Sequence, residues 1–179
     1  AQIGMANACN TLGIIYYNQG MYPRALEFDL KGLKLDNLIL KGAKTAEEIK
    51  AAKIGMGKRL GNTGNVYYSL TDFSKALDYY KQALALAEEI DSKVLISNWY
   101  GNIGNVYKDL GDYPQALDYY QKALNMEETL KNPTGITRYY GSIADVYYYQ
   151  KEYDRSLKFY QQALKLSREL GNLNYTGYW

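Results

Sequence analysis

Residues 101–124 read GNIGNVYKDLGDYPQALDYYQKAL, and the same pattern occurs 40 residues earlier and 40 residues later. Residues 61–84 read GNTGNVYYSLTDFSKALDYYKQAL, and residues 141–164 read GSIADVYYYQKEYDRSLKFYQQAL. A weaker copy, NTLGIIYYNQGMYPRALEFDLKGL, covers residues 10–33. A period of this length is typical of solenoids, in which each repeat buries its apolar face only against its neighbours. The chain is therefore predicted to be a repeat protein with an extended binding surface.

Each copy has the features of two consecutive helices. In the third copy Tyr100, Ile103 and Tyr107 recur at the three- and four-residue spacing of one helical face. Gly111 interrupts this pattern, and Pro114 suits the first turn of a second helix, where its missing N–H costs nothing. Because every strong pattern has a helical period, we expect more than roughly 60% helix and no sheet.

The repeated residues resemble the tetratricopeptide repeat, whose helices carry an aromatic residue, Leu-Gly and Tyr, then Ala, an aromatic residue and Ala. The third copy matches this pattern with Tyr100, Ile103-Gly104, Tyr107, Ala116, Tyr120 and Ala123. The first copy departs at its last two places, which hold Asp29 and Gly32. The resemblance implies an all-α fold, a right-handed superhelical solenoid of antiparallel helix pairs.

The spacing of the copies indicates a branch of this family. A standard repeat has about 34 residues, whereas the copies here lie 40 residues apart. In this the chain is similar to the longer-helix branch that includes the Pins/LGN adaptors. Similar Tyr- and Asn-rich arrays are appended to bacterial histidine kinases, nucleotide cyclases and transcription regulators.

The boundaries of the repeats follow the same period. We expect a single array over residues 1–179, with repeats at about 1–36, 45–90, 92–130 and 132–170 and a truncated fifth repeat at 172–179. A repeat that stops inside its first helix exposes the apolar face of the repeat before it. The chain is therefore expected to be an excised part of a larger signalling or regulatory protein.

One step of the period is longer than the others. The corresponding glycines of the first two copies, Gly13 and Gly64, lie 51 positions apart, which is 11 more than the 40 of the later steps. The added material covers about residues 37–47, and a loop is expected at Asp36, Asn37 and Gly42. Thr45 and Glu48 form a capping box before a helix. One interpretation is a longer connection with an early-starting helix. The other is a lid or docking element built from Leu38, Ile39 and Leu40.

The residues typical of catalytic sites are nearly absent. The chain has no His and one Cys, which excludes the usual zinc spacings and the Cys-His and Ser-His nucleophile pairs. We therefore expect no enzyme activity, no metal site and no cofactor. The net charge of +2 is too close to neutral to suggest nucleic acid. No apolar run approaches the roughly 18 residues of a membrane span, so no membrane contact by this fragment is expected.

The candidate binding residues lie on the face of each first helix that is opposite the core. The resemblance implies that this face lines a concave groove for an extended peptide. Gly and Asn are poor helix formers, so their repetition there indicates a purpose, and an Asn amide can both donate to and accept from a peptide backbone. The predicted peptide-binding residues are Lys58, Asn62, Asn65, Tyr68, Asn98, Asn102, Asn105, Lys108, Arg138 and Tyr148.

Further expectations concern how this face binds. Glycines beside the Asn residues would let a peptide backbone come close; they are Gly61, Gly101 and Gly141. The cations Lys58, Lys108 and Arg138 would favour an acidic partner. The alternative interpretation is that the Gly and Asn residues serve tight packing between repeats.

Two functions agree with these patterns. The first is a protein–protein interaction scaffold that binds an extended peptide or partner segment in the groove. The alternative is a self-associating regulatory module that controls an attached output domain. A homodimer through the C-terminal end is also expected, because apolar residues there lack a covering helix pair. These residues are Leu157, Tyr160, Leu164 and Trp179.

Overall fold

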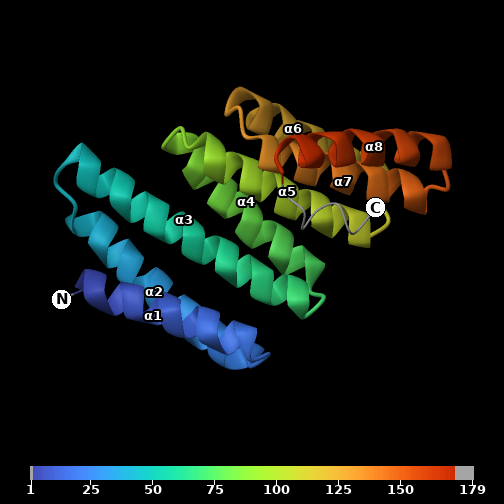
Figure 1. The fold of residues 1–179 in the computed structure, drawn as a ribbon. Coiled ribbons are helices and arrows are strands. Elements are labelled where there is room, and N and C mark those ends of the chain that lie inside the picture. The colour runs from blue at the N-terminus through green and yellow to red at the C-terminus, as the bar shows by residue number, and fades with distance from the viewer. Residues whose placement is uncertain (1, 172–179) are drawn as a thin grey trace. The chain divides into compact units, whose positions relative to one another are not determined.

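A computed structural model describes residues 2–171 of the chain (Figure 1). Within this range it has eight helices, no strand and 86% helical residues, so the expected all-α fold is confirmed. The helices are α1 (Gln2–Asn18), α2 (Tyr22–Gly42), α3 (Ala46–Ser69), α4 (Phe73–Glu89), α5 (Lys93–Asp109), α6 (Tyr113–Thr129), α7 (Pro133–Tyr149) and α8 (Tyr153–Glu169).

The chain forms two compact units. The N-terminal unit, residues 1–92, contains α1–α4, and the C-terminal unit, residues 93–179, contains α5–α8. Consecutive helices within each unit pack against one another (Figure 1). Each unit thus holds two helix pairs: repeat 1 is α1–α2, repeat 2 is α3–α4, repeat 3 is α5–α6 and repeat 4 is α7–α8. The predicted fifth repeat lies outside the described residues.

Sharp turns join the two helices of a repeat. Gly111 has a φ of 77°, in the left-handed region that glycine enters without a steric penalty. The side chain of Asp112 then caps α6 by accepting a hydrogen bond from the backbone N–H of Gln115. Asp72 caps α4 in the same way through Lys75. These local signals start the second helix of repeats 2 and 3 directly after the turn.

Small residues at the helix crossings let the two helices of a repeat approach closely, as the pattern predicts. A Cβ added to Gly104 would lie 2.7 Å from the ring of Tyr120, and one added to Gly64 would lie 2.6 Å from the ring of Tyr80. Ala116 of the facing helix is fully buried. The rings of Tyr80 and Tyr120 are the largest fully buried side chains in the described range, and they fill the centre of their repeats.

The longer step of the period lengthens two helices. α2 has 21 residues and α3 has 24, whereas the other helices have 17. The expectation of a loop at residues 36, 37 and 42 is wrong, because α2 continues to Gly42. The Asn37 amide donates to the backbone carbonyl of Leu33, one turn earlier, and does not break the helix. The capping box of Thr45 and Glu48 is present and starts α3 at Ala46.

Candidate functional site

A polar hollow lies on the first-helix face of the C-terminal unit. It has a volume of about 240 Å³, and α5 and α7 supply its walls. It brings together four of the ten residues predicted to bind a peptide: Asn98, Asn102, Asn105 and Arg138. Ser142 of α7 and the buried residues Trp99, Gly101 and Tyr139 complete the lining.

Gly101 of this hollow serves packing between repeats. A Cβ at this position would lie 2.6 Å from the hydroxyl oxygen of Tyr139, which comes from α7. Tyr139 is 3% exposed, and its hydroxyl donates to the backbone carbonyl of Ser97 at 2.9 Å. The expectation that Gly101 lets a peptide backbone approach is therefore wrong, because a tyrosine of the next repeat already occupies that space.

Core tyrosines orient the central Asn residues of the face. The hydroxyl of Tyr120 donates to Asn105 Oδ1 at 2.6 Å, and the hydroxyl of Tyr80 donates to Asn65 Oδ1 at 2.7 Å. Burial raises the pKa of Tyr80, so this phenol keeps its proton and remains a donor. Since each amide oxygen is held from the core side, the amide NH₂ group is the part that can serve a ligand.

Repeat 4 carries a variant of this pair. Asp145 stands at the position of Asn65 and Asn105, and Tyr160 stands at the position of the two tyrosines. The Tyr160 hydroxyl donates to the Asp145 carboxylate. Sequence reasoning did not assign the tyrosines this orienting role, although the 15-residue spacing of the pair recurs in three repeats.

The matching face of the N-terminal unit holds a much smaller hollow, of about 30 Å³. The predicted residues Asn62 and Asn65 of α3 line it together with Asp29 of α2 and three residues of α1. The Asn62 amide donates to Asn10 Oδ1 at 3.1 Å, across to α1. The α1 residues that line this hollow are Gly13, Ile14 and Tyr17.

The other predicted residues lie away from these two hollows. Lys58 is exposed on α3, and the ring of Tyr68 packs at 5.8 Å from the ring of Phe73. Lys108 forms an ion pair with Asp109 at 3.6 Å. Tyr148 lines a different hollow.

Arg138 combines a ring contact with an ion pair. Its guanidinium lies 4.9 Å from the ring centroid of Tyr139 and 3.7 Å from the carboxylate of Glu127. Half of its side chain, 51%, is exposed, so part of its positive charge faces the hollow.

An apolar hollow of about 590 Å³ lies on repeat 4. It contains three of the four residues expected at the C-terminal edge, namely Leu157, Tyr160 and Leu164, and it also contains Tyr148 and Tyr149. Leu157 is 56% exposed, as are both of these tyrosines. The fourth expected residue, Trp179, lies outside the described residues.

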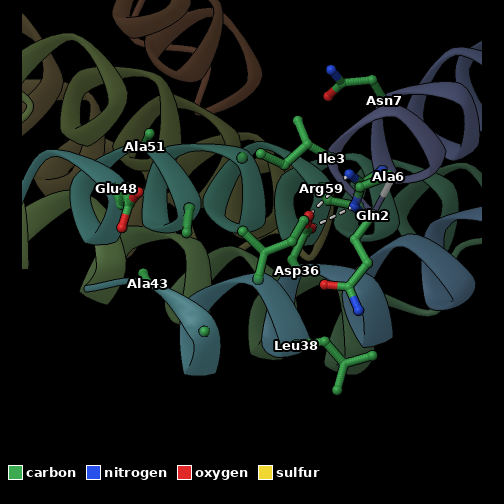
Figure 2. Close-up of a pocket in the computed structure, with 14 residues that line it drawn as sticks. Gln2, Ile3, Ala6, Asn7, Asp36, Leu38, Ala43, Glu48, Ala51 and Arg59 are labelled. Atoms are coloured by element: carbon green, nitrogen blue, oxygen red, sulfur yellow. Dashed lines mark hydrogen bonds and ion pairs between the residues drawn. The ribbon is translucent and has the colours of Figure 1, made fainter. Parts of the chain in front are cut away.

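A further hollow, of about 440 Å³, results from the lengthened helices and was not predicted (Figure 2). Arg59 and Asp36 line it with a buried ion pair whose Nε–Oδ2 distance is 2.7 Å. The only sequence signal was the longer step of the period. Its apolar lining includes Ile3, Ala6, Leu38, Ile39, Ala51 and Ala52, so two of the three residues in the predicted docking element contribute to it.

Between residues 2 and 171, no group of three or more His, Cys, Asp or Glu side chains could hold a metal ion. None of the helices in that range combines the length and apolar character that a membrane crossing requires.

Known sequence families and solved structures agree with this architecture. Sequence models of the tetratricopeptide repeat match residues 5–35, 58–90 and 95–169. No curated protein matches the chain. Repeats of this family are typically non-catalytic protein-interaction modules.

Three solved structures resemble the chain in fold. The apo form of RapI has a TM-score of 0.83 at 17% identity, over 98% of this chain and 60% of that one. BtubC (BKLC) from P. vanneervenii has a TM-score of 0.81 at 17% identity, over 96% of this chain and 66% of that one. Aspartyl phosphate phosphatase F from Bacillus subtilis has a TM-score of 0.85 at 15% identity, over 98% of this chain and 43% of that one. The chain thus spans 43% to 66% of the length of these proteins. With its helix pairs and three family matches, the chain belongs to the tetratricopeptide repeat family and has the fold of its interaction scaffolds.

Proposed function

We propose that this scaffold binds an extended segment of a partner protein along the first-helix face, with the hollow between α5 and α7 as a principal contact. The observation that carries the proposal is the orientation of Asn65 and Asn105. Tyr80 and Tyr120 hold their amide oxygens from the core side. Both amides therefore present N–H donors, which suit the backbone carbonyls of a ligand.

The spacing of the Asn residues on α5 supports an extended ligand. At a rise of about 1.5 Å per residue, Asn98 and Asn105 lie about 10 Å apart along the helix axis. An extended chain covers the same distance in about three residues. Asn102 lies between them on the same wall. Side-chain amides that pair with a backbone would accept many ligand sequences.

The charge beside this hollow favours an acidic group on the partner. Arg138 is half exposed in the wall, although it also faces Glu127 at 3.7 Å. We assign the contact with an acidic residue to Arg138, because Lys58, Tyr68, Lys108 and Tyr148 do not line either hollow on this face.

The test uses peptides selected from a random library against the wild-type chain. The double variant Asn65→Asp with Asn105→Asp keeps an oxygen acceptor for Tyr80 and Tyr120, as Asp145 does for Tyr160, but removes the NH₂ donors. Loss of one hydrogen bond of about 1 kcal/mol in either unit corresponds to a roughly fivefold weaker affinity for the segment bound there. Asn125→Asp, on the exposed outer face of α6, is the matched control. Equal binding by the double variant, or failure to select any peptide, would contradict the proposal.

The alternative function, a self-associating regulatory module, is favoured by the apolar face of repeat 4. We propose pairing of two copies through Leu157 and the neighbouring tyrosines, because exposed apolar patches of this kind are typical of contact surfaces. Sedimentation of the wild-type chain should then show a concentration-dependent dimer, and Leu157→Glu should be monomeric. A dimer that persists unchanged in Leu157→Glu would exclude this face.

A further inference from the structure

Repeat 1 differs from the other repeats at two positions whose side chains are hydrogen-bonded to each other in repeats 2 to 4. Repeats 2 to 4 pair a core tyrosine with an Asn or Asp of the first helix, through the hydroxyl. In repeat 1 the tyrosine is replaced by Asp29 and its partner by Ile14. Both members of the pair thus differ at once, and the Asp29 side chain is shorter than the tyrosine that it replaces.

Asp29 is buried without a hydrogen bond for one of its oxygens. The residue is 1% exposed, and within residues 2–171 its Oδ1 atom has no hydrogen-bond partner. A Cβ at Gly13 would lie 2.5 Å from this oxygen, so Oδ1 lies against α1. Asp29 and Gly13 both line the hollow of about 30 Å³. Burial raises the pKa of Asp29 to about 7, against the opposing effect of Arg59.

The cation that acts on Asp29 is Arg59, which is paired with another carboxylate through two of its nitrogens, while within residues 2–171 its Nη1 atom has no hydrogen-bond partner. Arg59 directs Nε and Nη2 to Asp36, at 2.7 and 3.3 Å. The Asp29 oxygen therefore lacks a donor in a place where burial without one is costly. The hollow that Asp29 helps to line has room for about one water-sized group, and Asn62 and Asn65 of the face that the proposed function assigns to a ligand also line it.

We propose that this hollow takes a primary ammonium group, the side-chain terminus of a lysine in the bound partner segment, with Asp29 as its counter-ion. An ammonium is a compact donor of about the size of a water molecule, whereas the planar guanidinium of arginine is larger. Because Asn62 uses its amide N–H toward Asn10, its oxygen is a second acceptor at the rim. Ile14 and Tyr17 supply apolar surface for the methylene stem. This inference rests on the proposed function and names the partner chemistry at repeat 1.

The test is a titration with methylammonium chloride, followed by NMR through the side-chain amides of Asn62 and Asn65. Tetramethylammonium chloride at equal ionic strength is the control, because it has the same charge but no N–H donor. We expect saturable shifts with methylammonium only. Asp29→Asn, which preserves shape, should weaken them at least about tenfold because a charge-assisted hydrogen bond is lost. Ile14→Asn with Asp29→Tyr restores the residues of repeats 2 and 3, fills the hollow and should abolish the response.

Equal shifts with tetramethylammonium, or an undiminished response in the restored double variant, would overturn the inference. A lack of response in the wild-type chain would also overturn it, and the hollow would then hold water only. The peptide experiment with Asn65→Asp and Asn105→Asp is independent of this titration. Peptide binding that depends on those Asn residues, without a methylammonium response, would therefore remove the lysine subsite and leave the groove function in place.

Discussion

The helix junctions α2–α3 and α6–α7 occupy equivalent places in their two units but hold different side chains. At α6–α7 the rings of Tyr120 and Tyr139 pack 6.4 Å apart. Beside them the buried carboxylate of Glu127 accepts from Ser97 Oγ at 2.5 Å and from Asn132 Nδ2 at 2.7 Å. At α2–α3 the corresponding residues are Asp29, Asp36 and Arg59.

The difference shows how much a repeat can vary at one junction. At the aromatic junction Tyr120 and Tyr139 are buried, and the Glu127 carboxylate accepts two hydrogen bonds. The charged junction pairs Asp36 with Arg59, but among the described residues 2–171 one Asp29 oxygen and one Arg59 nitrogen have no hydrogen-bond partner. Each junction packs the second helix of one repeat against the first helix of the next, so this packing tolerates either set of side chains.

Removal of the Arg59 charge at the α2–α3 junction should have the largest effect on the free energy of unfolding. Arg59→Ala leaves Asp36 buried without its cation, and loss of one member of a buried ion pair costs about 3–5 kcal/mol. Thermal and urea unfolding followed by circular dichroism would measure this loss. The double variant Arg59→Leu with Asp36→Leu should recover most of it, since an apolar pair leaves no uncompensated charge. A single variant as stable as the wild type would mean that the junction carries little of the stability.

We expect the second-largest effect from pH, because Asp29 at the α2–α3 junction changes its pKa on folding. The pKa of Asp29 rises from its usual 3.8 to about 7 on folding, so the folded chain favours the protonated form. The contribution of Asp29 to the free energy of unfolding should therefore be fully present below about pH 4 and be lost as the pH rises from 4 through 7, by on the order of 4 kcal/mol. Asp29→Asn should remove this slope. Unfolding curves at pH 4, 6 and 8 measure it, and an equal slope in the variant would refute the assignment.

We expect the smallest effect from a substitution that disturbs the packing at the aromatic junction. Gly101→Ala places a methyl group against the Tyr139 hydroxyl, and such overpacking costs typically about 1–3 kcal/mol. Gly55→Ala is the matched control, since it is also in mid-helix and nothing lies within 4 Å of its added Cβ. It should stabilise the chain by about 0.5–1 kcal/mol. Opposite signs in thermal unfolding would confirm that Gly101 is required for packing, whereas stabilisation by both would contradict it.

Regular features of the chain were predictable because they depend on local, repeated signals. The helix pairs, the close approach at Gly64 and Gly104, and the capping box at Thr45 all follow from residue types at fixed spacings. The Asn face was predictable for the same reason, since its members recur with the period. The continuation of α2 through Asn37 was not predictable in this way, because the amide could bond to its own helix or break it.

The sequence by itself determined the all-α class, the repeat and the polar face of the first helices, since periodicity decides which side of a helix is buried. Only the tertiary structure decided which glycine meets a tyrosine, which amide oxygen a core hydroxyl holds, and which carboxyl lacks a donor. These contacts join residues from different helices, such as Gly101 with Tyr139 and Asn105 with Tyr120. They depend on distances between helices that no spacing along one helix can specify.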